Sequence, residues 1–65
     1  MNTYEKYFAE FGLTPDPLCG VDEDGEDVIV SIDDDCACVK TLQGNGWIRT
    51  NIYHRDGTVE ELYQR

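Results

Sequence analysis

Three cysteines and one histidine are the residues of this chain that could bind a metal ion. Cys36 and Cys38 are separated by one residue, and Cys19 and His54 lie elsewhere in the sequence. Together they have the composition of a Cys3His zinc site. In a strand, however, Cys36 and Cys38 would stand roughly 6.5–7 Å apart, too far for two thiolates that share one zinc ion. Cysteines that pack as small apolar residues are the alternative, and we expect no metal and no cofactor.

Acidic residues dominate the charge of the chain. Fourteen Asp and Glu residues face five Lys and Arg residues, which gives a formal net charge of −9. No Lys or Arg occurs between Tyr7 and Val39. Because binding to phosphates requires Lys and Arg, direct contact with DNA, RNA or an anionic membrane is disfavoured. A protein partner with a basic surface, or divalent cations, would be attracted instead, and simple solubility is the alternative explanation.

The spacing of the acids suggests which basic surface they would bind. Two short stretches carry an acid at every second position, Asp22, Asp24 and Glu26, and then Asp33 and Asp35. In extended backbone, side chains two residues apart point the same way and stand roughly 6.5–7 Å apart. Successive phosphates of one nucleic-acid strand are separated by roughly the same distance through space. We therefore predict a mimic of nucleic acid that binds the basic surface of a nucleic-acid-handling protein.

In size and charge, the chain resembles small acidic proteins of phages and other mobile elements that inhibit restriction or CRISPR nucleases. The resemblance rests on length and charge, and no motif matches residue by residue, so no family is assigned. It implies an inhibitor of the anti-CRISPR or anti-restriction type that acts through a protein partner.

Motifs for calcium binding and catalysis do not fit the chain. An EF-hand loop starting at Asp22 would need Gly at position six and Glu at position twelve, where the chain has Asp27 and Asp33. His54 is the only histidine, and no Ser or Asp stands at a recognisable triad spacing from it. A chain of 65 residues also has little material for the walls of an active site. We predict a binding protein rather than an enzyme.

Four strands must position these residues, and two turns determine how the strands pair. The predicted strands are Asp27–Ile32, Cys36–Gln43, Trp47–His54 and Thr58–Gln64. Between them, Gly44–Gly46 and Arg55–Gly57 each place Asn or Asp directly before Gly, which is the strongest short-range signal for a β-hairpin. Three-residue loops would set the register, with three facing pairs: Leu42 and Ile48, Cys38 and Ile52, and Cys36 and His54.

One helix precedes the strands. Residues 2–11 are predicted to be helical, with Asn2 as the N-cap and Gly12 as a left-handed residue after the last turn. Its apolar stripe is aromatic and consists of Tyr4, Tyr7, Phe8 and Phe11. Residues 12–26 contain two prolines and are predicted to be a connection, in which Val21 could open a short extra strand before a turn at Asp24–Gly25. The expected fold is α+β, a single domain over residues 1–65 with one N-terminal helix packed on a four-stranded antiparallel meander.

A single helix can cover only one face of this sheet. The predicted register places Ile48, Ile52 and Leu62 on one face, and Ala37, Val39, Trp47, Tyr53, Val59 and Tyr63 on the other. Either the helix covers the Ile and Leu face and leaves the aromatic face to a partner, or it covers the aromatic face and residues 14–26 cover the other. An uncovered apolar face marks an interaction site, so a homodimer through the sheet is the alternative to the inhibitor.

The predicted partner-binding residues combine charge with aromatic anchors. They are Asp22, Asp24, Glu26, Asp33, Asp34, Asp35, Trp47, Tyr53 and Tyr63. The N-terminus lacks the pattern of a secretion signal, and no stretch approaches the roughly 20 apolar residues of a membrane span. The three cysteines are an odd number and do not suggest a disulfide framework, so we expect a cytoplasmic protein.

Overall fold

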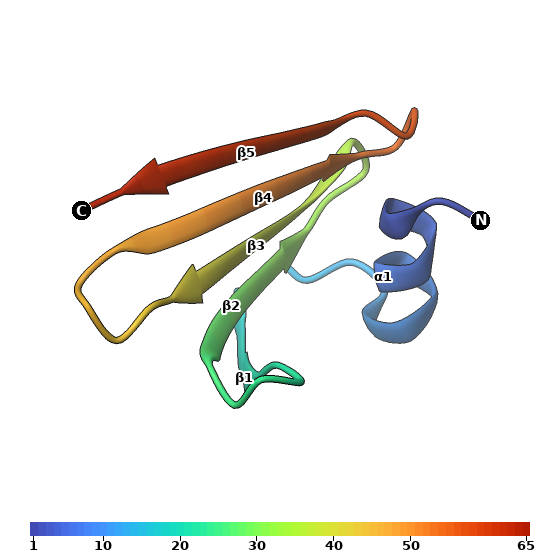
Figure 1. Ribbon diagram of the computed structural model, residues 1–65. Coiled ribbons are helices and arrows are strands. Elements are labelled where there is room, and N and C mark those ends of the chain that lie inside the picture. Colours follow the sequence, from blue (N-terminus) through green and yellow to red (C-terminus); the bar gives the residue numbers. More distant parts are fainter.

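The computed structural model describes residues 1–65 as one helix against one face of a five-stranded antiparallel sheet (Figure 1). The elements are α1 (Thr3–Phe11), β1 (Leu18–Val21), β2 (Asp27–Ile32), β3 (Cys36–Leu42), β4 (Ile48–His54) and β5 (Val59–Gln64). Each strand pairs with the next one along the chain, which makes the sheet a meander. The predicted α+β class is confirmed, whereas the predicted number of four strands is wrong.

The additional strand, β1, lies within the predicted connection over residues 12–26. Leu18 pairs with Val30, and Val21 pairs with Asp27. This pairing satisfies backbone groups that β2 would otherwise present at an open edge. The Asp22 carboxylate accepts hydrogen bonds from the N–H groups of Asp24 and Glu26, and these bonds form the turn into β2. The sequence offered a short strand opening at Val21 only as an option, because four residues are too short a run to show a clear alternation, whereas β1 ends at Val21.

Both three-residue turns have the predicted geometry. Gly46 and Gly57 adopt φ angles of 90° and 97°, a region that glycine enters without steric cost. The three predicted facing pairs of β3 and β4 are confirmed, and these two strands and β5 each differ from their predicted bounds by one residue. Because pairing determines which side chains share a face, the predicted division of residues between the two faces is confirmed as well.

The helix begins and ends at the predicted caps. Asn2 Oδ1 accepts a hydrogen bond from the Glu5 N–H at 2.8 Å. Gly12, with φ of 68°, donates its N–H to the Phe8 carbonyl at 2.8 Å. With nine residues, α1 is too short to cross a membrane.

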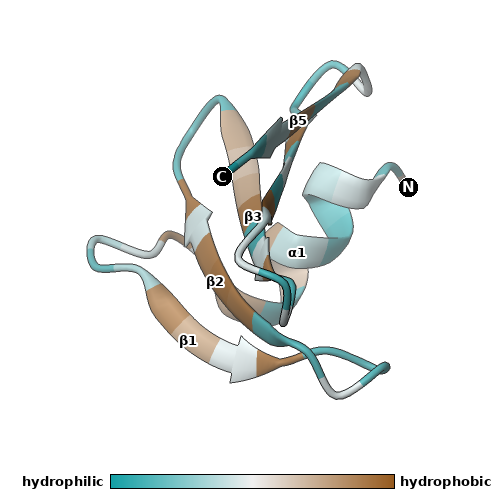
Figure 2. Cartoon of the chain, turned by 60° about the vertical axis from the view of Figure 1, so that its left-hand side comes forward, coloured by the Kyte–Doolittle hydropathy of each residue, from teal (hydrophilic) through white to brown (hydrophobic).

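The hydrophobic core lies between α1 and the strands β2 and β3. It consists of Tyr4, Val30, Ile32, Ala37 and Val39. The helix therefore covers the aromatic face, as in the second of the two predicted arrangements, but residues 14–26 do not cover the opposite face as that arrangement required. Figure 2 shows brown, apolar colour along most of β1 and β2 and teal along the turns that follow them. Phe8 and Phe11 remain exposed, so only the Tyr4 and Tyr7 half of the aromatic stripe packs on the sheet.

Thr14 ties the chain after the helix to the end of β2. Its Oγ1 accepts a hydrogen bond from the Ile32 N–H at 2.6 Å, and its own N–H donates to the Ile32 carbonyl at 3.0 Å. We expect Thr14→Val to lower the free energy of unfolding by about 1–3 kcal/mol, because the Ile32 N–H is left buried without a partner. Urea denaturation measures the loss. Thr14→Ser keeps the hydroxyl and should lose clearly less, and equal losses would contradict this role.

Candidate functional site

The predicted partner-binding acids lie in two turns at opposite ends of β2. Asp22, Asp24 and Glu26 belong to the β1–β2 turn, and Asp33–Asp35 form the β2–β3 turn. Glu26 and Asp33, which flank β2, are seven residues apart, so the strand separates the two turns by roughly 23 Å. The predicted mimicry of a nucleic-acid strand required an evenly spaced row of acids along extended backbone. Neither segment is extended, so the acids do not form such a row. That spacing is wrong because Asp22 and Asp33 bond to the backbone after them and turn the chain.

Asp33 has a structural role in its turn. Its Oδ1 accepts hydrogen bonds from the N–H groups of Asp35 and Cys36, both at 2.8 Å. The Cys36 bond and then the Asp35 bond stabilise the ionised carboxylate and lower the pKa of Asp33. The carboxylates of Asp24, Asp34 and Asp35 make no hydrogen bond or ion pair within the chain and are exposed to solvent.

The depressed pKa of Asp33 predicts a pH dependence of stability. Because the folded pKa lies below the ordinary value of about 3.9, this contribution is complete above that value and is lost as pH falls through the folded pKa. The urea midpoint should therefore decrease below about pH 4. Asp33→Asn keeps an oxygen that accepts both N–H groups but does not titrate, so its decrease should be smaller. Equal decreases for wild type and variant would show that other carboxyl groups cause the effect.

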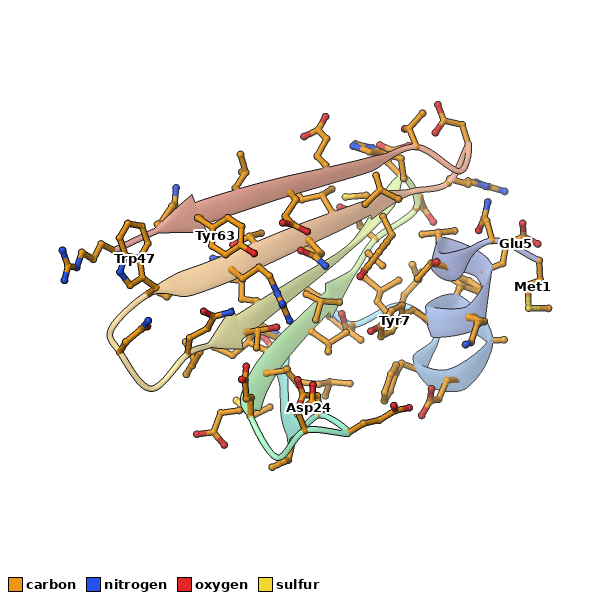
Figure 3. The ribbon with its side chains drawn as sticks, viewed as in Figure 1. Met1, Glu5, Tyr7, Asp24, Trp47 and Tyr63 are labelled. Atoms are coloured by element: carbon orange, nitrogen blue, oxygen red, sulfur yellow. The ribbon has the colours of Figure 1, made fainter.

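The three predicted aromatic anchors lie in different environments. Tyr53 is half-buried and stacks on Tyr7, with ring centroids 5.7 Å apart, so its ring contributes to the packing of α1. Trp47 and Tyr63 lie on the same sheet face, at the end that the helix does not cover (Figure 3). Arg65 lies over the Trp47 ring, 5.2 Å from its centroid. Of the three, Trp47 and Tyr63 are thus the exposed aromatic side chains of this face.

A groove of about 440 Å³ lies on the helix side of the sheet, between α1 and the β1–β2 turn. Its floor is formed by side chains of β2, β3 and β4, namely Val28, Val30, Val39, Thr41, Arg49, Asn51 and Tyr53. Its walls are Tyr7, Glu10 and Phe11 of the helix and Val21–Asp24 of the turn. Figure 3 shows Tyr7 and Asp24 on the two sides of this space. Its volume is within the range of small-ligand sites, roughly 300–1,000 Å³.

Arg49 and Asn51 distinguish the floor of this groove. Arg49 is half-buried, and its buried Nε has no hydrogen-bond partner in the protein. Asn51 donates from Nδ2 to the Tyr53 hydroxyl at 3.0 Å, but its buried Oδ1 also has no partner. Buried polar atoms normally are hydrogen-bonded. Sequence reasoning did not select either residue, although two polar side chains at alternate positions on the covered face of a strand are a signal for such a site.

The candidate metal ligands do not come together. Cys36 faces His54 across β3 and β4, as predicted, but Cys19 lies on β1 and pairs with Ile29. No group of three or more His, Cys, Asp or Glu side chains is arranged to hold a metal ion. Burial, and next the charge of Asp33, raise the pKa of the Cys36 thiol. This thiol is therefore protonated at neutral pH and is not an activated nucleophile.

The sheet face opposite α1 is covered by no helix or strand. Its apolar side chains, which we call the open sheet face, are Ile29, Cys38, Leu42, Ile48, Ile52 and Leu62. Leu42 and Leu62 are 40% and 47% exposed. Residues 14–26 do not cover this face, because part of that segment extends the sheet as β1. The protein is strongly acidic, yet this face carries few charges. Apart from His54, the strand residues on this face include three charged side chains, Asp27, Lys40 and Glu60.

The chain thus presents three surfaces: the acidic turns at the ends of β2, the groove above Arg49 and Asn51, and the open sheet face. The first is charged, the second combines one cation with an acidic rim, and the third is apolar. No protein-family model, no curated protein and no solved structure matches the chain.

Proposed function

We propose that this is a small, non-enzymatic interaction protein that binds a basic surface of another protein. One observation supports the proposal above all others: the negative charge is not compensated within the fold. Of fourteen acidic side chains, only Glu60 lies within ion-pair distance of a basic side chain, and its partner is His54 at 3.3 Å. Charges without an internal partner create a field that attracts and orients a partner of opposite sign.

The partner class that this charge fits is a nucleic-acid-handling protein with Lys and Arg in its binding channel. The protein would inhibit or modulate it by occupying that channel, as an anti-CRISPR or anti-restriction inhibitor does. The two acidic turns would contact two separate basic patches, since β2 holds them roughly 23 Å apart. Trp47 and Tyr63 add exposed aromatic area of the kind that anchors protein interfaces.

A pull-down from a lysate of the native host, washed with increasing salt, tests the proposal. A nuclease, polymerase or other nucleic-acid-binding protein should bind and elute as the salt concentration rises, because the attraction is screened. The informative variant neutralises four exposed acids and leaves the turn-forming Asp22 and Asp33 intact: Glu23→Gln, Asp24→Asn, Asp34→Asn and Asp35→Asn. We expect at least about a tenfold loss of affinity and a weaker salt dependence.

A matched control removes the same charge from other exposed positions: Glu5→Gln, Asp16→Asn, Asp27→Asn and Glu61→Gln. Because both variants have the same net charge, the control separates local contact from overall charge. The control should retain most of the affinity. If neither variant weakens binding, the acidic turns do not bind the partner and the proposal fails.

The open sheet face favours a second candidate, a homodimer formed through the sheet. Interface centres are depleted in charged residues and rich in apolar ones, and this face has that composition within a chain of net charge −9. Lys40 lies on the central strand, while Asp27 and Glu60 lie on the strands β2 and β5 to either side. Two copies packed face to face could therefore pair the Lys40 of each with an acid of the other.

A further inference from the structure

Arg49 is the one arginine that the fold does not provide with a partner. The Arg55 guanidinium donates to the Asp34 carbonyl at 3.4 Å, and Arg65 lies over the Trp47 ring. Arg49 makes no hydrogen bond, no ion pair and no contact of that kind, although its Nε is buried. A guanidinium whose Nε is buried without a partner is stabilised by an anion that can accept from its fork of donors.

The rim of the groove restricts which anion can approach. Glu10, Asp22, Glu23 and Asp24 line the same groove as Arg49. Phosphate and other free polyanions would meet four carboxylates for one guanidinium and would be repelled. The ligand that fits carries a single negative charge for Arg49 and a positive charge for the acidic rim.

The hydrogen-bonding groups of the floor refine this class. Arg49 offers donors to a carboxylate, and Asn51 Oδ1, two residues along β4, is a buried acceptor without a partner in the chain. A main-chain carboxylate next to an amide N–H has this arrangement. Tyr7 and Phe11 on the helix side supply an apolar wall for the stem of a long side chain.

We propose that the groove binds the C-terminal residue of a peptide that ends in lysine or arginine. The terminal carboxylate pairs with Arg49, and the amide N–H of the same residue donates to Asn51 Oδ1. The aliphatic stem lies along Tyr7 and Phe11, and the cationic end reaches the acidic rim at Glu10, on the same wall of the groove. This proposal deepens the proposed function, because it names the segment of the basic partner that the groove would bind. It rests on the proposed function only in assuming that the peptide belongs to that partner.

Two probes differing in one group test the site: a short acetylated peptide that ends in lysine with a free carboxylate, and the same peptide with a C-terminal amide. The amide form carries one more positive charge, so attraction to the acidic protein alone would favour it. The proposal requires the opposite order, with the free acid binding at least about tenfold more tightly in calorimetry. An amide peptide that binds equally well or better overturns the proposal.

Substitutions at the arginines locate the effect. Arg49→Gln should remove the preference for the free acid, whereas Arg55→Gln, which removes the same charge outside the groove, should keep it. Circular dichroism confirms that each variant is folded, and Arg49→Lys, which retains the cation, should keep part of the preference. A preference that survives in Arg49→Gln assigns the carboxylate to another site and contradicts the proposal.

Two further results separate this proposal from its alternatives. Free lysine, whose α-ammonium replaces the amide N–H, should bind more weakly than the peptide, and tighter binding would assign the groove to a small metabolite instead. The pull-down partner should bind Arg49→Gln more weakly while its salt dependence persists. If Arg49→Gln binds that partner as tightly as the wild type does, the groove does not bind the partner and the groove proposal fails. The proposed function still holds in that case, provided that the variant with four neutralised turn acids binds the partner more weakly.

Discussion

Replacing Tyr4 by alanine is expected to unfold most of the protein at 25 °C. Tyr4 is only 5% exposed and is the one helical residue of the buried core. Its hydroxyl also donates to the Asp33 carbonyl at 2.8 Å, which connects α1 to the β2–β3 turn. Truncating a buried aromatic side chain to alanine costs about 3–5 kcal/mol. A core of this size supplies only about 3–5 kcal/mol of stability in total, so little would remain.

Far-UV circular dichroism and the dispersion of amide signals in NMR measure this loss of structure. Phe8→Ala is the matched control, because Phe8 is an aromatic residue of the same helix that is 41% exposed. It should remain folded and lose about 1 kcal/mol or less. Tyr4→Phe, which removes only the hydroxyl, should lose about 1 kcal/mol. A folded Tyr4→Ala protein would show that the sheet is stable without the helix.

Replacing Leu42 and Leu62 together by glutamine is expected to abolish self-association through the open sheet face. Both leucines are at least 40% exposed, so the monomer fold should tolerate the change. A face-to-face dimer would bury the part of each leucine that is still exposed, 40% and 47%, which contributes about 0.7–1.4 kcal/mol per side chain. A dimer contains two copies of this pair, so the dissociation constant should rise at least about 100-fold.

Light scattering and analytical ultracentrifugation across a dilution series measure this effect. Leu13→Gln is the control, because Leu13 is 53% exposed but precedes the sheet in the chain. The control should behave like the wild type, which we expect to reach the mass of a dimer at high concentration. A wild type that remains monomeric throughout the series would contradict the homodimer and leave the open sheet face to a different partner.

The two proposed modes of association are geometrically compatible. The groove lies on the helix side of the sheet, and the open sheet face lies on the other side. A dimer formed through the open sheet face would therefore leave both grooves accessible. It would also present two sets of acidic turns to one partner, and such bivalent contact raises overall affinity without any new contact.

Several features of this protein were predictable from short stretches of its sequence, because the chemistry that specifies them is local. Asn2 and Gly12 determined the two ends of the helix through bonds to backbone groups within four residues. Gly46 and Gly57 determined the loop lengths of two hairpins and therefore their register and the division of side chains between the faces. The net charge, which depends on composition alone, determined the class of partner that we propose.

The tertiary structure decided what depends on residues far apart in the chain. Whether α1 covers the aromatic or the aliphatic face is a difference in packing, and both faces were apolar enough to accept the helix. The strand β1 forms only because β2 offers an edge to pair with. The polar residues at the alternate positions 49 and 51 were a signal in the sequence, but only the structure shows that Arg49 Nε and Asn51 Oδ1 have no hydrogen-bond partner. Whether a polar atom finds a partner depends on every neighbouring element, including elements far away in the chain.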